Sequence, residues 1–222
     1  MQRALRQTLP ALTFVLSACA ASGGTAERGA VPAEAGVSAE PGAAMEHQHG
    51  EADAAVGPGY TAADVRFMQD MIGHHEQALL MTAMAPGRDA REMVLRLVQK
   101  IDISQRDEIA LMKAWLTERN QPLPDEHHMH GMLMPGMLTD SQLAQLRAAR
   151  GPEFERLFLT LMIQHHEGAL HMVDMLFETP GAAQDSDIFR FVTDVVTDQS
   201  DEIDIMMHML ELLAANRGSE TR

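Results

Sequence analysis

The chain contains an internal repeat, and few folds accommodate it. Residues 67–84 (FMQDMIGHHEQALLMTAM) and residues 158–175 (FLTLMIQHHEGALHMVDM) are identical at 10 of 18 positions. Residues 105–116 and residues 199–210 are identical at 6 of 12 positions. A pair of helix-like segments has therefore been duplicated. One pair cannot cover its own apolar faces, whereas two pairs related by a pseudo-twofold axis form a four-helix bundle.

Capping and turn residues divide this region into helices. Residues 61–64 resemble a capping box at the start of the first helix, and Pro86 and Gly87 end that helix. The other long helices are expected near residues 89–119, 152–177 and 187–216, and a short helix is expected after Thr139. No segment alternates apolar and polar residues over a convincing length. We predict an all-α four-helix bundle with a short extra helix before the third long helix.

The N-terminus has the pattern of a lipoprotein signal. Arg3 and Arg6 precede an apolar stretch that is too short to span a bilayer. Residues 16–19 (Leu-Ser-Ala-Cys) resemble a bacterial lipobox, which implies cleavage before Cys19 and lipidation of its thiol. An ordinary signal peptide with an incidental cysteine is the alternative. We predict an envelope protein that a lipid anchors on the periplasmic or extracytoplasmic side of a membrane.

The chain divides into three parts. Residues 1–18 are the predicted signal peptide. Residues 19–59 are rich in Ala, Gly, Pro, Glu and Ser, so they bury too little surface to offset their ordering entropy and are predicted to form a disordered tether. Residues 60–217 are predicted to form the bundle domain.

Charge and cysteine content exclude several functions. The chain has 17 Lys and Arg against 32 Asp and Glu, a formal net charge of −15, so we expect no nucleic-acid binding. A single cysteine excludes a disulfide framework and any thiolate-rich metal site. The capacity of the chain for soft metal ions resides in its 18 methionines and 11 histidines.

The repeated His-His pairs lie on the inward faces of their predicted helices. At 100° per residue, the apolar stripe of the first helix contains both histidines of its motif, and the second motif repeats this arrangement. Four imidazoles and four thioethers would then line one interior: His74, His75, His165, His166, Met71, Met81, Met162 and Met172. By the same count Gln105, Glu108, Gln199 and Glu202 face inward and could orient the histidines.

Two interpretations of these residues remain open. Methionine fills core gaps well, and a buried histidine that is hydrogen-bonded to glutamate is a stable structural element. Four costly imidazoles in one interior exceed what a purely structural core needs, however, which favours metal contact. Histidine and thioether without thiolate favour soft Cu(I) or Ag(I) over Mg²⁺, Ca²⁺ or Mn²⁺.

Two further clusters have the same donor chemistry. One lies in the predicted tether and contains His47 and His49. The other is a loop of eleven residues that contains three histidines and four methionines, and its first donors are His127, His128, Met129 and His130. Such biased composition is typical of metal-binding segments.

The doubled motif resembles a known family. Met-Ile-x-His-His-x-x-Ala-x-x-Met at residues 71–81 and 162–172, together with Gln-x-x-Glu-Ile-x-x-Met at residues 105–112 and 199–206, is similar to the pattern of domain-of-unknown-function family three hundred and five. This resemblance implies a ferritin-like bundle, and some family members are exported copper or silver binders linked to metal tolerance.

These observations favour a lipoprotein that binds Cu(I) or Ag(I) for buffering, tolerance or transfer, rather than an enzyme. The predicted bundle, residues 60–217, lacks the Glu-x-x-His motif of di-iron bundles, and the chain lacks the His-Glu-x-x-His motif of zinc proteases. A metal-dependent oxidase and a metal-free structural or interaction module of the envelope are the alternatives. Metal ions and the membrane are the expected partners, and the sequence identifies no protein partner.

Overall fold

The computed structural model describes residues 55–124 and 134–220 of the 222-residue chain. The predicted signal peptide and Cys19 lie outside the described residues. The same is true of most of the predicted tether and of six donors of the two outlying clusters, His47, His49, His127, His128, Met129 and His130. Met134 and Met137, the last two methionines of the loop cluster, are described.

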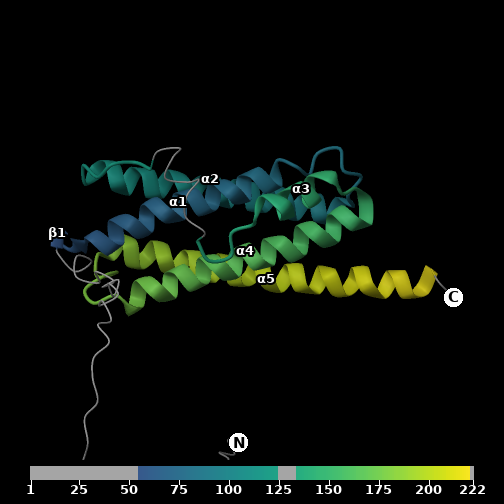
Figure 1. The fold of residues 1–222 in the computed structure, drawn as a ribbon. Helices are drawn as coiled ribbons and strands as arrows, with labels where there is room; N and C mark the ends of the chain where they lie inside the picture. The colour runs from purple at the N-terminus through teal and green to yellow at the C-terminus, as the bar shows by residue number, and fades with distance from the viewer. Residues whose placement is uncertain (1–54, 125–133, 221–222) are drawn as a thin grey trace, which may run out of the picture. The chain divides into compact units, whose positions relative to one another are not determined.

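Five helices form almost all of the described part of the chain (Figure 1). They are α1 (Ala62–Thr82), α2 (Glu92–Glu118), α3 (Asp140–Ala148), α4 (Gly151–Glu178) and α5 (Ser186–Glu220). This confirms the predicted all-α fold, including the short extra helix before the third long one. None of the helices in residues 55–124 and 134–220 has the length and hydropathy needed to cross a membrane.

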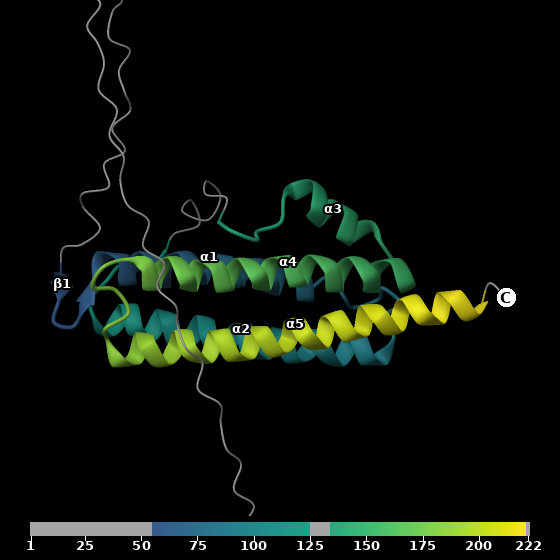
Figure 2. The ribbon, with the colours of Figure 1, turned by 90° about the horizontal axis from the view of Figure 1, so that it is seen from below.

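The helices pack in the duplicated arrangement that the repeat predicts. α1 packs against α2, α4 packs against α5, and α1 and α4 join the two pairs. Figure 2 shows α1 and α4 in one layer and α2 and α5 in the other, with α3 on the outer side of the first layer. Thr61 and Thr139 cap α1 and α3 through capping boxes, and a proline in the first turn starts α4.

A short hairpin precedes the first helix. β1 (Ala55–Gly57) pairs antiparallel with β2 (Tyr60–Thr61), so regular structure begins inside the range that composition assigned to the tether. Tyr60 is buried and meets Trp115 edge to face, with ring centroids 5.3 Å apart. The guanidinium of Arg119 lies 4.4 Å from the Trp115 ring and forms an ion pair with Asp185 at 3.0 Å.

Equivalent acidic residues hold each helix pair against the other. Asp64 in the first turn of α1 accepts a hydrogen bond from the backbone amide of Ala183, between α4 and α5, at 2.7 Å. Glu155 is its counterpart in the second repeat, and it accepts from the guanidinium of Arg91, between α1 and α2, at 2.6 Å. Both carboxylates are buried. The duplication therefore extends from sequence to tertiary contacts.

Candidate metal centre

A layer of buried polar side chains divides the core into two apolar clusters. On each long helix, the residues before this layer belong to one cluster and the residues after it belong to the other. We call this layer the central belt. Its members are His74, His75, Gln105, Glu108, His165, His166, Gln199 and Glu202, all of them buried. The prediction that these eight residues face inward is confirmed.

The middle of the belt lies where α1 and α4 cross. The rings of His74 and His165 are in contact, with centroids 3.9 Å apart and planes tilted by 38°. Nε2 of His165 donates to the backbone oxygen of His74 at 2.9 Å, and Nε2 of His74 donates to the backbone oxygen of Pro135 at 3.0 Å. The two histidines are equivalent in the repeat, yet they use different acceptors.

The outer histidines of the belt each meet a glutamate of the neighbouring helix. His75 on α1 is hydrogen-bonded through Nε2 to Glu108 on α2. His166 on α4 is hydrogen-bonded through Nε2 to Glu202 on α5, at 2.8 Å. Glu202 also forms an ion pair with Lys100 of α2 at 3.5 Å, which links the two helix pairs.

The hydrogen bonds determine which ring nitrogen of each histidine is protonated. All four Nε2 atoms face a carbonyl or carboxylate oxygen, and these oxygens only accept hydrogen bonds. Nε2 therefore carries the proton, and in a neutral ring Nδ1 keeps its lone pair. Within the described part of the chain, none of the four buried Nδ1 atoms has a hydrogen-bond partner.

The central pair is held in the neutral state by its surroundings. Burial, followed by the unfavourable charge of neighbouring His75, lowers the pKa of His74 from 6.5 to about 3. Burial, followed by the charge of His74, places the pKa of His165 well below its usual value. Two imidazoles this close together and this deeply buried cannot both be cations, so both rings are neutral at physiological pH.

The two glutamines of the belt are also without partners. Neither amide atom of Gln105 or Gln199 is hydrogen-bonded to another described residue, although both side chains are buried. An unpaired buried amide costs free energy, so a core that contains several unpaired polar atoms needs water or a ligand to satisfy them. The unpaired Nδ1 atoms of the histidines and the unpaired amides of the glutamines are therefore consistent with an ion bound in the belt.

A segment that sequence reasoning missed covers the central pair. Residues 134–138, which we call the strap, run across the outer side of α1 and α4. Gln77 bonds to both backbone groups of Leu138, with its Oε1 accepting at 2.7 Å and its Nε2 donating at 3.1 Å. Gln164 donates to the backbone oxygen of Gly136 at 3.2 Å.

The strap approaches α4 so closely that only glycine fits there. A Cβ built at Gly168 would lie 2.1 Å from the backbone oxygen of Pro135, and one built at Gly136 would lie 2.5 Å from the backbone oxygen of Gln164. The repeat did contain a signal of this contact. Gly168 replaces Gln77 at the equivalent position of the first motif.

The structure separates the four predicted thioether ligands. Met71 and Met172 belong to one apolar cluster, whereas Met81 and Met162 belong to the other. This follows from the antiparallel crossing of α1 and α4, which places the start of one motif beside the end of the other. Among the described residues, no group of three or more His, Cys, Asp or Glu side chains is arranged to hold a metal ion.

Comparison with solved structures shows what this bundle is similar to. A DUF305 fragment from Deinococcus radiodurans is 32% identical over 69% of this chain and 99% of that chain, with a TM-score of 0.60. A DUF305 protein from Streptomyces coelicolor, described as a candidate secreted protein, is 31% identical over 68% and 94% of the two chains, with a TM-score of 0.61.

A third similar structure is described as CopM in the Cu(I)-bound form. It is 27% identical over 67% of this chain and 95% of that chain, with a TM-score of 0.53. No curated protein sequence matches the chain.

The family model described as a domain of unknown function, DUF305, matches residues 64–210. This range begins in the first turn of α1 and ends within α5, so it includes the whole central belt and the strap. The chain belongs to the DUF305 family.

Proposed function

We propose that the protein binds Cu(I) or Ag(I) in the cell envelope and serves to buffer, tolerate or transfer these ions. The observation that carries this proposal is the state of the belt histidines. Each one donates Nε2–H to an oxygen atom and keeps a buried Nδ1 lone pair without a partner. Metal-binding histidines typically have this arrangement, because the hydrogen bond fixes the tautomer and orients the ring.

The donor chemistry selects the class of ion. Imidazole nitrogens and the methionines in the flanking clusters are soft to intermediate donors, and no thiolate is needed. Cu(I) and Ag(I) accept few ligands, so they do not require a group of three His, Cys, Asp or Glu side chains. A solved structure of CopM, a similar protein, is of the Cu(I)-bound form, which supports the same ion here.

The low pKa values of the central pair favour metal binding at acidic pH as well. A proton competes with a metal ion for the same lone pair of histidine. Because burial lowers the pKa of His74 to about 3, a second proton does not occupy Nδ1 of this ring in mildly acidic surroundings. Protons therefore compete for this lone pair only at a lower pH than in an ordinary histidine.

We propose a binding role rather than catalysis. The only two carboxylates in the belt, Glu108 and Glu202, are both engaged by histidines, whereas di-iron oxidases use several carboxylates as direct ligands. Aerobic and anaerobic incubation with Cu(I) separates the two roles. An oxidase would turn over Cu(I) repeatedly with oxygen, and a binding protein would saturate.

The experiment that tests the belt is a quadruple variant of the processed chain. Replacing His74, His75, His165 and His166 by Gln keeps hydrogen-bonding side chains but removes the imidazole lone pairs. We expect Cu(I) affinity or stoichiometry to fall in competition with a chromogenic chelator. The rise in melting temperature on Cu(I) addition should also shrink, because a ligand of the native state stabilises by mass action.

A matched control separates the belt from the loop. The variant His127→Gln, His128→Gln, His130→Gln removes three imidazoles from the chain without touching the belt. It should alter binding without altering the stability of the metal-free protein. Wild-type Cu(I) affinity and stoichiometry in a folded quadruple variant would refute the belt site.

A further inference from the structure

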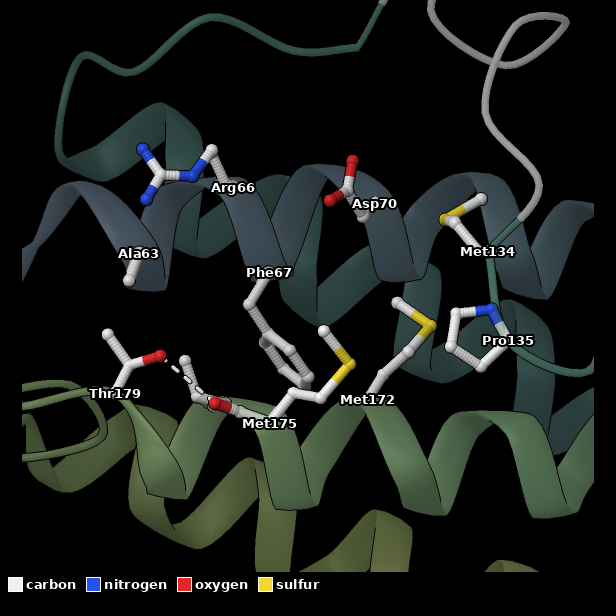
Figure 3. A pocket seen from close by; sticks show the side chains of 10 residues that line it. Ala63, Arg66, Phe67, Asp70, Met134, Pro135, Met172, Met175 and Thr179 are labelled. Atoms are coloured by element: carbon white, nitrogen blue, oxygen red, sulfur yellow. Dashed lines mark hydrogen bonds between the residues drawn. The ribbon is translucent and has the colours of Figure 1, made fainter. Parts of the chain in front are cut away.

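A pocket lined by methionines lies between the N-terminal part of α1 and the C-terminal part of α4. It has a volume of about 290 Å³ and is separate from the central belt. Its sulfur-bearing residues are Met134 from the strap and Met172 and Met175 from α4. Figure 3 shows Met172 and Met175 close to each other beside the ring of Phe67, with Met134 on the opposite side of the pocket, near Asp70.

Equivalent methionines of the two repeats have different surroundings. Met172 and Met175 are equivalent to Met81 and Met84 in the first repeat. Met81 and Met84 are buried in the apolar cluster that also contains Leu143 and Leu146 of α3. Met175, in contrast, is 50% exposed.

A small residue leaves this pocket open. Ala63 lines the pocket, and its equivalent in the second repeat is Phe154, a fully buried residue of the other cluster. In that other half of the bundle, Phe154 belongs to the same apolar cluster as Leu143 and Leu146 of α3. The two repeats therefore differ at this position, and the smaller side chain of Ala63 lines the pocket.

The lining of the pocket suits a soft cation. Met175 is half exposed, so the packing of the core does not account for its position. Met134 of the strap adds a third thioether to the pocket that Met172 and Met175 line. Thioethers bind Cu(I) and Ag(I) without losing a proton. Asp70 lines the same pocket and offsets the charge of a cation, while Arg66 on the same helix opposes it. The Phe67 ring can stabilise a cation through its face.

We propose that Met134, Met172 and Met175 form a second site for a soft monovalent cation, Cu(I) or Ag(I). This proposal rests on the proposed function, because it assumes that the protein meets these ions. It adds a site whose ligands are thioethers alone, in contrast to the imidazoles of the belt. The two sites share the strap: Met134 supplies a ligand, and the next residue, Pro135, supplies the oxygen that accepts from His74.

The direct test is a titration with Ag(I), which does not change its oxidation state, followed by NMR of methyl-labelled methionines. The full processed chain is used, with the loop donors replaced (His127→Gln, His128→Gln, Met129→Leu, His130→Gln, Met132→Leu). We expect the methyl signals of Met134, Met172 and Met175 to shift together and to saturate at one equivalent. The signal of Met207, an exposed methionine of α5 outside both apolar clusters, is the internal control and should not take part in this shift.

Variants give the corresponding stoichiometry. Replacing Met134, Met172 and Met175 by Leu keeps volume and apolar character, so we expect the fold to remain and one equivalent of Ag(I) or Cu(I) to be lost. The matched variant Met207→Leu, at an exposed methionine of α5 outside both apolar clusters, should keep the wild-type stoichiometry. Met134→Leu and Met175→Leu, both outside the buried core, provide the same test without altering Met172.

The outcomes separate this site from the belt. If the His→Gln quadruple variant loses an ion while the three methyl signals never move, the belt function stands and the pocket site is refuted. If the methyl signals shift in the quadruple variant as in the wild type, the pocket binds independently of the belt. If the wild-type chain binds neither Ag(I) nor Cu(I), both proposals are overturned.

Discussion

The imidazole ring of His74 packs against that of His165, with centroids 3.9 Å apart and planes tilted by 38°, at the point where α1 and α4 cross. These residues occupy equivalent positions in the two repeats, so the contact lies on the pseudo-twofold axis that relates them. Each ring is buried, and neither Nδ1 has a partner among the described residues. The duplication has thus placed the same polar group in the core twice, in direct contact.

This contact predicts that the metal-free protein loses stability in acid. The pKa of His74 is about 3 in the folded chain and 6.5 in an exposed histidine, so protonation favours the unfolded chain. Stability is therefore complete above pH 6.5 and declines as the pH falls toward 3. From pH 7 to pH 5, His74 alone should lower the free energy of unfolding by about 2 kcal/mol.

Urea unfolding at a series of pH values measures this dependence. The double variant His74→Gln, His165→Gln should show a clearly shallower loss of stability between pH 7 and pH 5. It retains His75 and His166, so the difference between the two slopes belongs to the central pair. Equal slopes in both proteins would mean that the two rings are already protonated or are exposed in solution.

The two glutamates of the belt should differ in their contribution to stability. Glu202→Ala leaves Nε2 of His166 buried without an acceptor, which costs about 1–3 kcal/mol. Glu108→Ala should cost less, because the Glu108 side chain retains 11% of its exposure and water can replace it beside His75, whereas Glu202 retains 1%. Thermal unfolding of the two metal-free variants gives the comparison, and a larger loss for Glu108→Ala would contradict it.

The position of the strap should depend on residue 168 being glycine. In Gly168→Ala, the new Cβ would lie 2.1 Å from the backbone oxygen of Pro135, so the strap must move away from α4. We expect a loss of about 1–3 kcal/mol in stability. Hydrogen exchange should become faster at the amide of Leu138, which Gln77 now holds. An unchanged exchange rate would show that the strap is not held in this position.

The lipid anchor remains a prediction about residues outside the described part of the chain. Cys19→Ala should abolish membrane association and leave the bundle folded, since the bundle contacts described above involve residues from Ala55 onward. Detergent-phase partitioning of the wild type and the variant, together with circular dichroism of both, provides the measurement. A variant that still sediments with membranes after a high-salt wash would show that Cys19 is not the anchor.

Much of the architecture is encoded locally and was predictable. The helix limits follow from capping boxes, prolines and glycines close to each end, as at Thr61 and Thr139. The inward faces follow from helical periodicity, so the burial of all four histidines and of Glu108 and Glu202 was predicted correctly. The strap and the methionine pocket were not predicted, because both depend on a segment that is not helical and on contacts between distant residues.

The sequence by itself determined the duplicated all-α bundle and the direction in which each helix turns its histidines, because periodicity and repetition are properties of the chain. Only the tertiary structure decided the register of one helix against another. The rise per residue places Met71 before and Met81 after the histidines of α1, but it does not say which residues of α4 lie at those levels. The antiparallel crossing of α1 and α4 puts Met71 in the cluster of Met172 and Met81 in the cluster of Met162. It also brings the rings of His74 and His165 together and leaves Met172 and Met175 beside an open pocket.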